Sequence, residues 1–167
     1  MIGNKVVIIG VSAVGKSTFA RAFAQKTGRA VTHMDTIMWE PGWNYVGAEV
    51  TARTIREIAV TDNWVIEGYI TKAARADLFQ QADSIIYLDY PRWIGVWRYL
   101  RRSIAHKRNA RVELPGSPDT FSFKTAKLIW QKGEVWKLNK LLLENDWEDK
   151  IIRLHSPKEA ASFIQNL

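Results

Sequence analysis

The stretch KVVIIGVSAVGKS, residues 5–17, decides how this chain folds. Its first six residues contain a run of four β-branched side chains and end in glycine, a pattern typical of a strand buried on both faces of a parallel sheet. Phe19 and Phe23 then follow at helical spacing, and Gly28 provides the signal that ends a helix. We therefore predict a strand over residues 5–10, a loop, and a helix from Ser17 to residue 27.

The predicted loop carries a phosphate-binding motif. Residues 10–17 match G-x-x-x-x-G-K-[ST] in full, between a strand and a helix, which is the context that the motif requires. The glycines permit a tight turn whose backbone N–H groups point into one concavity, and the helix dipole adds positive charge there. We expect Lys16 to neutralise the β- and γ-phosphates of a nucleotide and the Ser17 hydroxyl to bind Mg²⁺. The predicted nucleotide-binding residues are Gly10, Val11, Ser12, Ala13, Val14, Gly15, Lys16, Ser17 and Thr18.

Strands and helices alternate along the rest of the chain. Apolar runs predict further strands over residues 30–34, 63–67, 84–89 and 150–154. Helical periodicity predicts helices over residues 49–61, 71–82, 91–107 and 124–144, and from Pro157 onward. This alternation predicts an α/β fold with a five-stranded parallel sheet between two helical layers. Residues 36–48 and 103–123 are expected to be irregular.

Composition excludes several classes of protein. A chain of 167 residues is long enough to bury an ordinary apolar core as one domain. The absence of cysteine rules out a disulfide scaffold, a thiolate nucleophile and thiol-rich metal sites. No apolar run approaches the roughly 18 residues of a membrane span, and the short apolar run near Met1 does not fit a signal peptide. We therefore expect a cytoplasmic protein with no membrane partner.

The net charge of +7 is concentrated in one segment of the chain. No acidic residue lies between Asp89 and Glu113, and the basic residues outside that segment equal the acidic ones in number. The seven basic residues of the segment are Arg92, Arg98, Arg101, Arg102, Lys107, Arg108 and Arg111. Such a segment is a solvated helix face, a nucleic-acid patch or a site for an anionic ligand.

The arginine spacing favours the last of these interpretations. The sequence LDYPRWIGVWRYLRR, residues 88–102, resembles the adenylate kinase pattern of a strand, a proline and a helix with paired R-x-x-x-R arginines. The resemblance implies that Arg98 approaches the adenine and phosphates of ATP, and that Arg102 approaches the phosphoryl group in transfer. Guanidinium groups suit this role because they offer planar, permanently charged donors. Arg101 falls outside the pattern.

The resemblance extends over nearly the whole chain. The chain is similar to the adenylate-kinase-related group called DNA topology modulation proteins, through the segments HMD (33–35), WEPGW (39–43), EGY (67–69) and LDYPR (88–92). It implies a P-loop NTPase fold of the adenylate/shikimate kinase type with a short lid. The single domain, residues 1–167, would contain an acceptor-binding segment at 36–62 and a lid insertion at 103–127. Fold kinship does not fix a reaction.

Two carboxylates are candidates for the chemistry. Glu67 stands where the related kinases place their Walker-B-type acid, so the resemblance implies that it holds Mg²⁺ through water; the alternative is a salt bridge at a strand end. Asp35 ends the second strand, where kinases of this fold bind the acceptor hydroxyl, or it caps a helical turn. His33 is expected to be structural. Because EGY replaces the DGFPR of true adenylate kinases, AMP is not the expected acceptor.

The aromatic residues are interpreted by their context. Trp93 and Trp97 repeat at i, i+4, and we expect them to form the buried face of their helix. Trp39 and Trp43 lie in a turn-rich segment, where a pocket wall and ordinary packing remain equally open. Residues 155–158 line the adenine or form a plain strand-to-helix turn. Further candidates to grip an anionic acceptor are Arg53, Arg56, Lys72 and Arg75.

Together these features predict an ATP-dependent kinase that transfers the γ-phosphoryl group of MgATP to a small-molecule acceptor. The expected catalytic residues are Lys16, Arg98, Arg102 and Asp35, with Ser17 and Glu67 on the metal. One alternative is a nucleotide-dependent DNA-associated protein, whose basic segment, interleaved with aromatic residues, meets a phosphate backbone. The other is nucleotide hydrolysis with no acceptor. The acceptor, the preferred base and the oligomeric state do not follow from the sequence.

Overall fold

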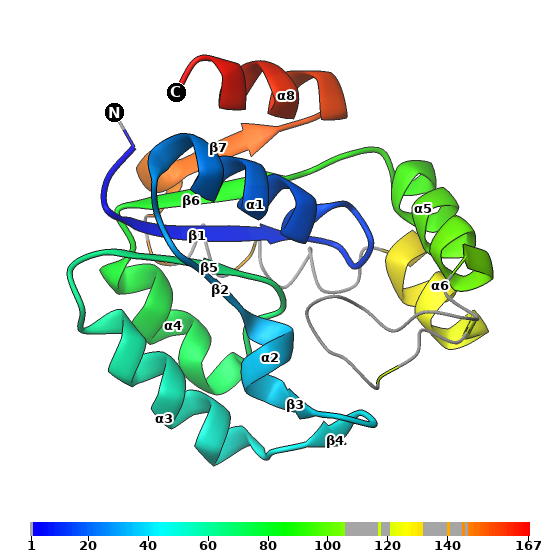
Figure 1. Ribbon diagram of the computed structural model, residues 1–167, viewed down its shortest axis with the longest axis horizontal. Helices are drawn as coiled ribbons and strands as arrows, with labels where there is room; N and C mark the ends of the chain where they lie inside the picture. Colours follow the sequence, from blue (N-terminus) through cyan, green and yellow to red (C-terminus); the bar gives the residue numbers. More distant parts are fainter. Residues whose placement is uncertain (1, 106–116, 118–120, 132–139, 141–144, 146) are drawn as a thin grey trace.

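Five parallel strands form the centre of the protein in a computed structural model that describes residues 2–105, 117, 121–131, 140, 145 and 147–167 (Figure 1). The strands are β1 (Lys5–Gly10), β2 (Val31–His33), β5 (Trp64–Glu67), β6 (Ser84–Leu88) and β7 (Ile151–Leu154). Their order across the sheet is β2-β5-β1-β6-β7. This arrangement confirms the predicted α/β fold and its five-stranded parallel sheet.

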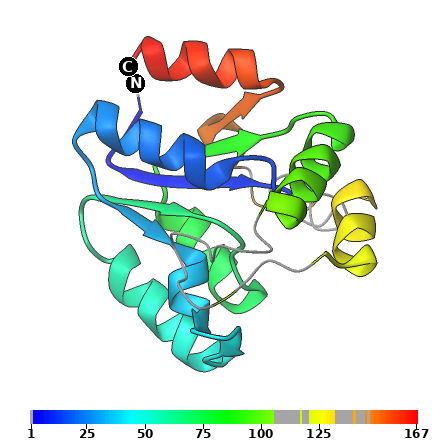
Figure 2. The same cartoon turned by 45° about the vertical axis from the view of Figure 1, so that its right-hand side comes forward.

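Helices cover both faces of the sheet. They are α1 (Lys16–Thr27), α2 (Met34–Met38), α3 (Ala48–Ala59), α4 (Lys72–Gln81), α5 (Arg92–Ala105), α6 (Phe123–Gln131) and α8 (Pro157–Gln165), with a 3-10 turn, η1 (Glu148–Lys150). Helices α1 and α8 lie together on one side, and α3 packs against α4 on the other (Figure 1). Helices α5 and α6 pack against each other beyond the end of the sheet (Figure 2). Within the described residues, no helix is long and apolar enough to cross a membrane.

The central strands are buried because each lies between two neighbours and under helices on both faces. In β1, the side chains of Val6, Val7 and Ile8 are fully buried, as the β-branched run predicted. Phe19 and Phe23 of α1 belong to the same buried core, and their ring centroids lie 6.4 Å apart. The carboxyl ends of β1, β2 and β5 lie at the same end of the sheet and position the residues that follow each strand.

Two segments differ from the sequence predictions. Residues 36–48, expected to be irregular, contain most of α2 and a hairpin of β3 (Trp39–Glu40) and β4 (Asn44–Tyr45), which pair antiparallel. In the predicted helix 124–144, the described part is α6, and most of residues 132–144 lies outside the described residues. Much of the segment 103–123 also lies outside them.

The prediction that Trp93 and Trp97 form a buried helix face is wrong. Each of the two side chains is 62% exposed. Helix α5 instead turns Gly95 and Tyr99 inward, and a Cβ atom at Gly95 would lie 2.9 Å from Cγ2 of Ile129 in α6. Because Gly95 has no side chain, α6 can pack closely against α5 at this residue. The side of α5 that carries Trp93 and Trp97 therefore faces outward.

Candidate functional site

The loop between β1 and α1 forms the predicted concavity. Gly10 and Gly15 adopt φ values of 153° and 109°, which side chains rarely tolerate. At Gly15 there is also no room for a side chain, because a Cβ atom would lie 2.7 Å from Nη1 of Arg98. An internal hydrogen bond stabilises the loop: the Val14 amide donates to the Val11 carbonyl at 3.3 Å. Helix α1 begins at Lys16, so its positive end faces this hollow.

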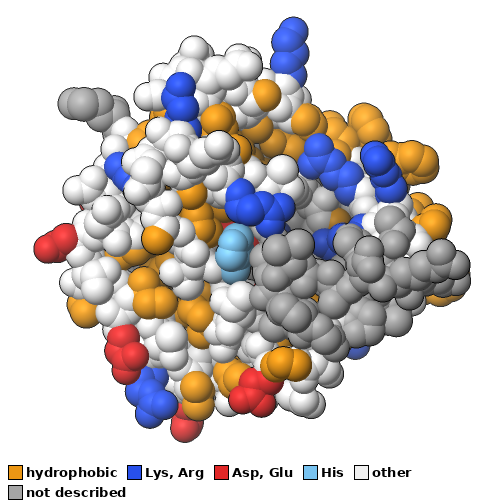
Figure 3. All heavy atoms as spheres, viewed as in Figure 1, with side chains coloured by type: hydrophobic (Ala, Val, Ile, Leu, Met, Phe, Trp, Pro, Cys, Tyr) orange, Lys and Arg blue, Asp and Glu red, His pale blue; other side chains and the backbone are white. Residues whose placement is uncertain are grey.

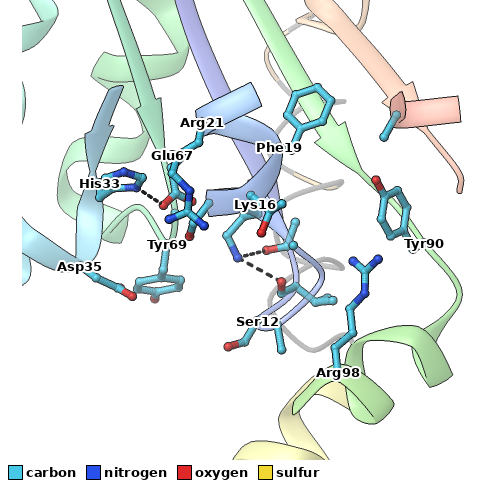
Figure 4. Close-up of a pocket in the computed structure, with 18 of the residues that line it drawn as sticks. Ser12, Lys16, Phe19, Arg21, His33, Asp35, Glu67, Tyr69, Tyr90 and Arg98 are labelled. Carbon is cyan, nitrogen blue, oxygen red and sulfur yellow. Dashed lines mark hydrogen bonds and ion pairs between the residues drawn. The ribbon is translucent and has the colours of Figure 1, made fainter. Parts of the chain in front are cut away.

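Lys16 lies over the loop. Its Nζ donates to the carbonyl oxygens of Gly10 at 3.1 Å and Val11 at 3.0 Å (Figure 4). The ammonium group therefore lies at the loop that lines the cavity.

Glu67 is a buried carboxylate beside the loop. The parallel register of β2 and β5 pairs His33 with Glu67, and His33 Nδ1 lies 2.6 Å from Glu67 Oε1 (Figure 4). Burial raises the pKa of the Glu67 carboxyl, but the hydrogen bonds to His33 and Ser17 and the charge of Lys16 together outweigh burial and hold this pKa below its usual value. An ionised carboxylate beside a serine hydroxyl is a donor set that Mg²⁺ accepts.

Asp35 lines the same cavity. It lies in the first turn of α2, where the N-cap position belongs to His33, so Asp35 is not the helix cap. Figure 4 shows its carboxylate directed toward the ring of Tyr69, which follows β5. Strand β2 ends at His33, one residue earlier than predicted, and this places Asp35 on a helix.

The two predicted arginines come to the loop from α5. Nη1 of Arg98 donates to the carbonyl of Val14, and its guanidinium carbon lies 5.9 Å from the ring centroid of Tyr90 (Figure 4). Arg102, one turn further along the helix, lines the same cavity. Arg101 is exposed and does not line it. The R-x-x-x-R spacing thus brings both guanidinium groups to the side of α5 that faces the loop.

These elements enclose one cavity of about 1290 Å³. Its wall at the far end comes from Tyr90 and from α8, including Pro157. The predicted alternatives for residues 155–158 are thus both present: Pro157 lines the cavity, and Ser156 Oγ caps α8 by accepting the Glu159 amide at 3.2 Å. A nucleotide and a second small molecule fit such a volume.

Trp39 is a cavity wall, and Trp43 supports it. Trp39 is half-buried and lines the cavity, and its ring meets that of Trp43 edge-on at 5.7 Å. Trp43 does not line the cavity. The hairpin is fixed by Ser117, whose buried Oγ accepts the amides of Gly42 at 3.0 Å and Trp43 at 3.3 Å.

The predicted acceptor-gripping residues do not line the cavity where they are described. Arg56 pairs with Asp77 at 3.3 Å, and Arg75 donates to the Ile70 carbonyl at 2.9 Å. Arg53 is exposed on α3 outside the cavity lining, and the Lys72 side chain lies outside the described part of the chain.

Arg21 lines the cavity instead, and sequence reasoning missed it. Figure 4 shows its guanidinium beside Glu67. The available signal was its spacing, since Arg21 follows Ser17 by four residues and so lies on the same face of α1. Tyr69 and Tyr90 also line the cavity and were not predicted.

Comparisons with known proteins identify the type of fold. The chain matches no protein-family model and no curated protein. Among solved structures it is similar to a gluconokinase from Sinorhizobium meliloti 1021, with a TM-score of 0.59 and 14% identity over 99% of this chain and 93% of the other. The chain has a P-loop kinase-like fold. At this identity the likeness is one of fold, and the resemblance to the topology modulation group stays a prediction.

Proposed function

We propose that this protein is an ATP-dependent phosphotransferase that moves the γ-phosphoryl group of MgATP to a hydroxyl of a small acceptor. The observation that carries the proposal is the convergence on one cavity of Lys16 from the loop, Arg98 and Arg102 from α5, and Asp35 from α2. Phosphoryl transfer needs little beyond positioned charges of this kind. A cytoplasmic location, as predicted from the sequence, suits a reaction that consumes MgATP.

Each charged group has a role in the proposed reaction. Lys16 exchanges the loop carbonyls for the β- and γ-phosphate oxygens, while Ser17, and Glu67 through water, hold Mg²⁺. When bound, Mg²⁺ neutralises charge that develops on the phosphates. Arg98 and Arg102 stabilise the equatorial oxygens of the phosphoryl group in transfer.

Asp35 completes the transfer on the acceptor side. Its carboxylate takes the proton of the attacking hydroxyl as the new O–P bond forms and the bond to the β-phosphate oxygen breaks, which releases ADP. The guanidinium of Arg21 is the complement of an anionic group on the acceptor, and Tyr69 and Trp39 give the wall its apolar surface. We infer an acceptor that carries hydroxyls and one anionic group. Sugar acids are the first compounds to test, since the structural neighbour is a gluconokinase.

The test is acceptor-dependent release of ADP. The purified protein is incubated with MgATP and a panel of sugar acids, with sugars and nucleoside monophosphates as comparison classes. A sugar acid should raise ADP release above the rate without acceptor, and Asp35→Asn should remove this increase. If no member of the panel raises the rate, the interpretation as a hydrolase without acceptor gains ground.

The arginines provide a sharper test. Arg98→Ala and Arg102→Ala should each lower kcat by about 10²-fold or more, with a much smaller change in nucleotide affinity, because their strongest contacts form in the transition state. Arg92→Ala is the matched control, since Arg92 is exposed on the same helix and does not line the cavity. Equal losses in turnover and affinity would count against the assigned roles.

The DNA-associated alternative draws on a different observation. Trp93 and Trp97 are exposed and lie beside basic residues, as stacking platforms for bases do. Against it, Arg98 and Arg102 face the cavity and Tyr99 is buried. Binding through about five phosphate contacts should weaken by two to three powers of ten between 50 and 200 mM salt in a gel-shift titration. Undetectable binding at low salt would eliminate this alternative.

A further inference from the structure

A groove lined by tryptophans lies on the outer side of α5, away from the phosphate loop. Residues 93, 97, 100 and 104 recur at helical spacing and form one stripe roughly 16 Å long. Trp93 and Trp97 are each 62% exposed, and Ile104 is 75% exposed. We call the hollow lined by Trp93, Val96, Trp97, Leu100 and Trp130 the tryptophan groove; its volume is about 450 Å³.

Of the groove residues, Val96 is partly buried against the core, whereas the three tryptophans are exposed within the described part of the chain. Helix α5 packs inward through Gly95 and Tyr99, and it contributes Arg98 and Arg102 to the nucleotide cavity. Trp93, Trp97 and Ile104 of the stripe therefore add little to the core, and no residue of the stripe lines the nucleotide cavity. Figure 3 shows hydrophobic side chains gathered over α5, with Lys and Arg side chains beside them. Adjoining exposed hydrophobic side chains rimmed by charged ones are a pattern found at interaction sites.

Charge selects the kind of partner. Across the described residues 90–104, 117 and 121–131 there is no aspartate or glutamate. Arg101 follows Trp97 by four residues, and Lys127 precedes Trp130 by three, so both basic side chains lie beside the groove. A second copy of the chain would bring the same charges face to face, and both copies carry a net charge of +7. An acidic partner is complementary to this rim.

Shape indicates what part of the partner binds. The groove lies between two packed helices and runs along about two turns of α5, and ridges of a third helix fit such a groove. Its lining is entirely apolar, whereas a single-stranded nucleic acid requires a basic channel along its backbone. We propose that the tryptophan groove docks an amphipathic helix of an acidic partner protein, with Leu, Ile or Phe at i, i+3 or i+4, and i+7, flanked by Asp and Glu.

The proposal is tested on the full-length chain with three labelled synthetic peptides of roughly 18 residues, about five helical turns. One has leucines at helical spacing and glutamates on the other positions, the second has lysines in place of glutamates, and the third is a scrambled form of the first. Fluorescence anisotropy should give the first peptide an affinity at least about tenfold above the other two, which corresponds to about 1.4 kcal/mol.

Variants locate the binding site. Trp97→Ala should weaken binding of the acidic peptide by more than about tenfold, and Arg101→Glu should reverse the preference between the acidic and basic peptides. Phe123→Ala is the control, because Phe123 is 83% exposed on α6 but does not line the groove. Far-UV circular dichroism and the melting temperature check that each variant is folded.

Other occupants are measured in parallel. Equal binding of the three peptides, or an affinity that survives Trp97→Ala, overturns the proposal. The proposal is also overturned if the acidic peptide does not bind and another occupant does so through Trp97. The occupants tested are an oligothymidine, vesicles that contain phosphatidylserine and, by sedimentation, a second copy of the chain. The result is independent of the proposed phosphotransfer, since the groove and the nucleotide cavity share no lining residue among those described.

Discussion

Lys16 contacts neutral oxygens in this structure, although its charge suits anionic ones. Hydrogen bonds from an ammonium to phosphate are about twice as strong as those to neutral acceptors, so a triphosphate competes well with the carbonyls of Gly10 and Val11. We expect Lys16→Ala to weaken MgATP binding by about 2 kcal/mol in titration calorimetry. The exposed Lys26, also on α1, is the matched control. Unchanged affinity in Lys16→Ala would contradict the assigned role.

The contact between His33 and Glu67 predicts a pH-dependent stability. Burial alone would raise the pKa of Glu67, and His33 is one of the groups that lower it below the usual value of 4.5. We expect His33→Ala to lower the free energy of unfolding by about 2 kcal/mol at neutral pH. Because a lowered pKa stabilises the fold above the unfolded-state value, the difference should shrink as the pH falls below 4.5 and Glu67 becomes protonated.

Urea unfolding of four proteins measures this effect: the parent chain, His33→Ala, Glu67→Gln and the double variant. In the Glu67→Gln background, His33→Ala should have a smaller effect, since the ionised partner is absent. Equal effects in both backgrounds would mean that His33 acts by packing alone.

At the level of elements, local signals predicted the strands and the phosphate loop. The β-branched runs predict β1 and β6, and the motif over residues 10–17 predicts the loop before α1. Each of these signals involves only residues close in sequence, and all three elements are present in the structure. The orientation of α5 depends on which of its sides packs against α6. The residues around Trp93 and Trp97 in the sequence do not determine that contact, so their exposure could not be predicted. The hairpin of β3 and β4 was missed because its turn places Gly42 and Trp43 at φ values of 83° and 63°, and tryptophan is not a usual residue for this conformation.

The packing of α5 on α6 and on the phosphate loop predicts the effect of a larger residue at position 95. A Cβ atom there would lie 2.9 Å from Ile129 Cγ2 and 3.5 Å from the Ser12 carbonyl oxygen. Gly95→Val should therefore move α5 outward and lower the free energy of unfolding by about 1–3 kcal/mol. Turnover should fall as well, with a smaller change in nucleotide affinity, since Arg98 moves with the helix.

Ile129→Ala tests the reason for that loss. Alone it destabilises by leaving a cavity, but combined with Gly95→Val it removes the side chain that the valine meets. The double variant should be more stable in chemical denaturation than the sum of the two single effects predicts. Simple additivity would indicate that the contact with Ile129 is not what excludes a side chain at position 95.

Across the whole molecule, the nucleotide cavity joins parts of the chain that are remote in sequence. Its lining runs from Gly10 in the loop to Gln165 near the end of α8, and includes α5 and α6. A ligand there contacts only the folded state, so MgATP at about 100 times its Kd should add roughly 2.7 kcal/mol to the free energy of unfolding. For a chain of this size that is a rise in Tm of about 5–11 °C.

Calorimetry should show this rise as one displaced transition, since the predicted single domain unfolds as a unit and each part of it contributes to the cavity. If Ser17 and Glu67 hold Mg²⁺ as proposed, the rise should require Mg²⁺. In Lys16→Ala at the same nucleotide concentration it should fall to about one third, since a loss of about 2 kcal/mol in affinity leaves roughly 0.9 kcal/mol of stabilisation. An equal rise in Lys16→Ala would place nucleotide binding outside the loop, and two transitions of which only one moves would show that the chain divides into two units.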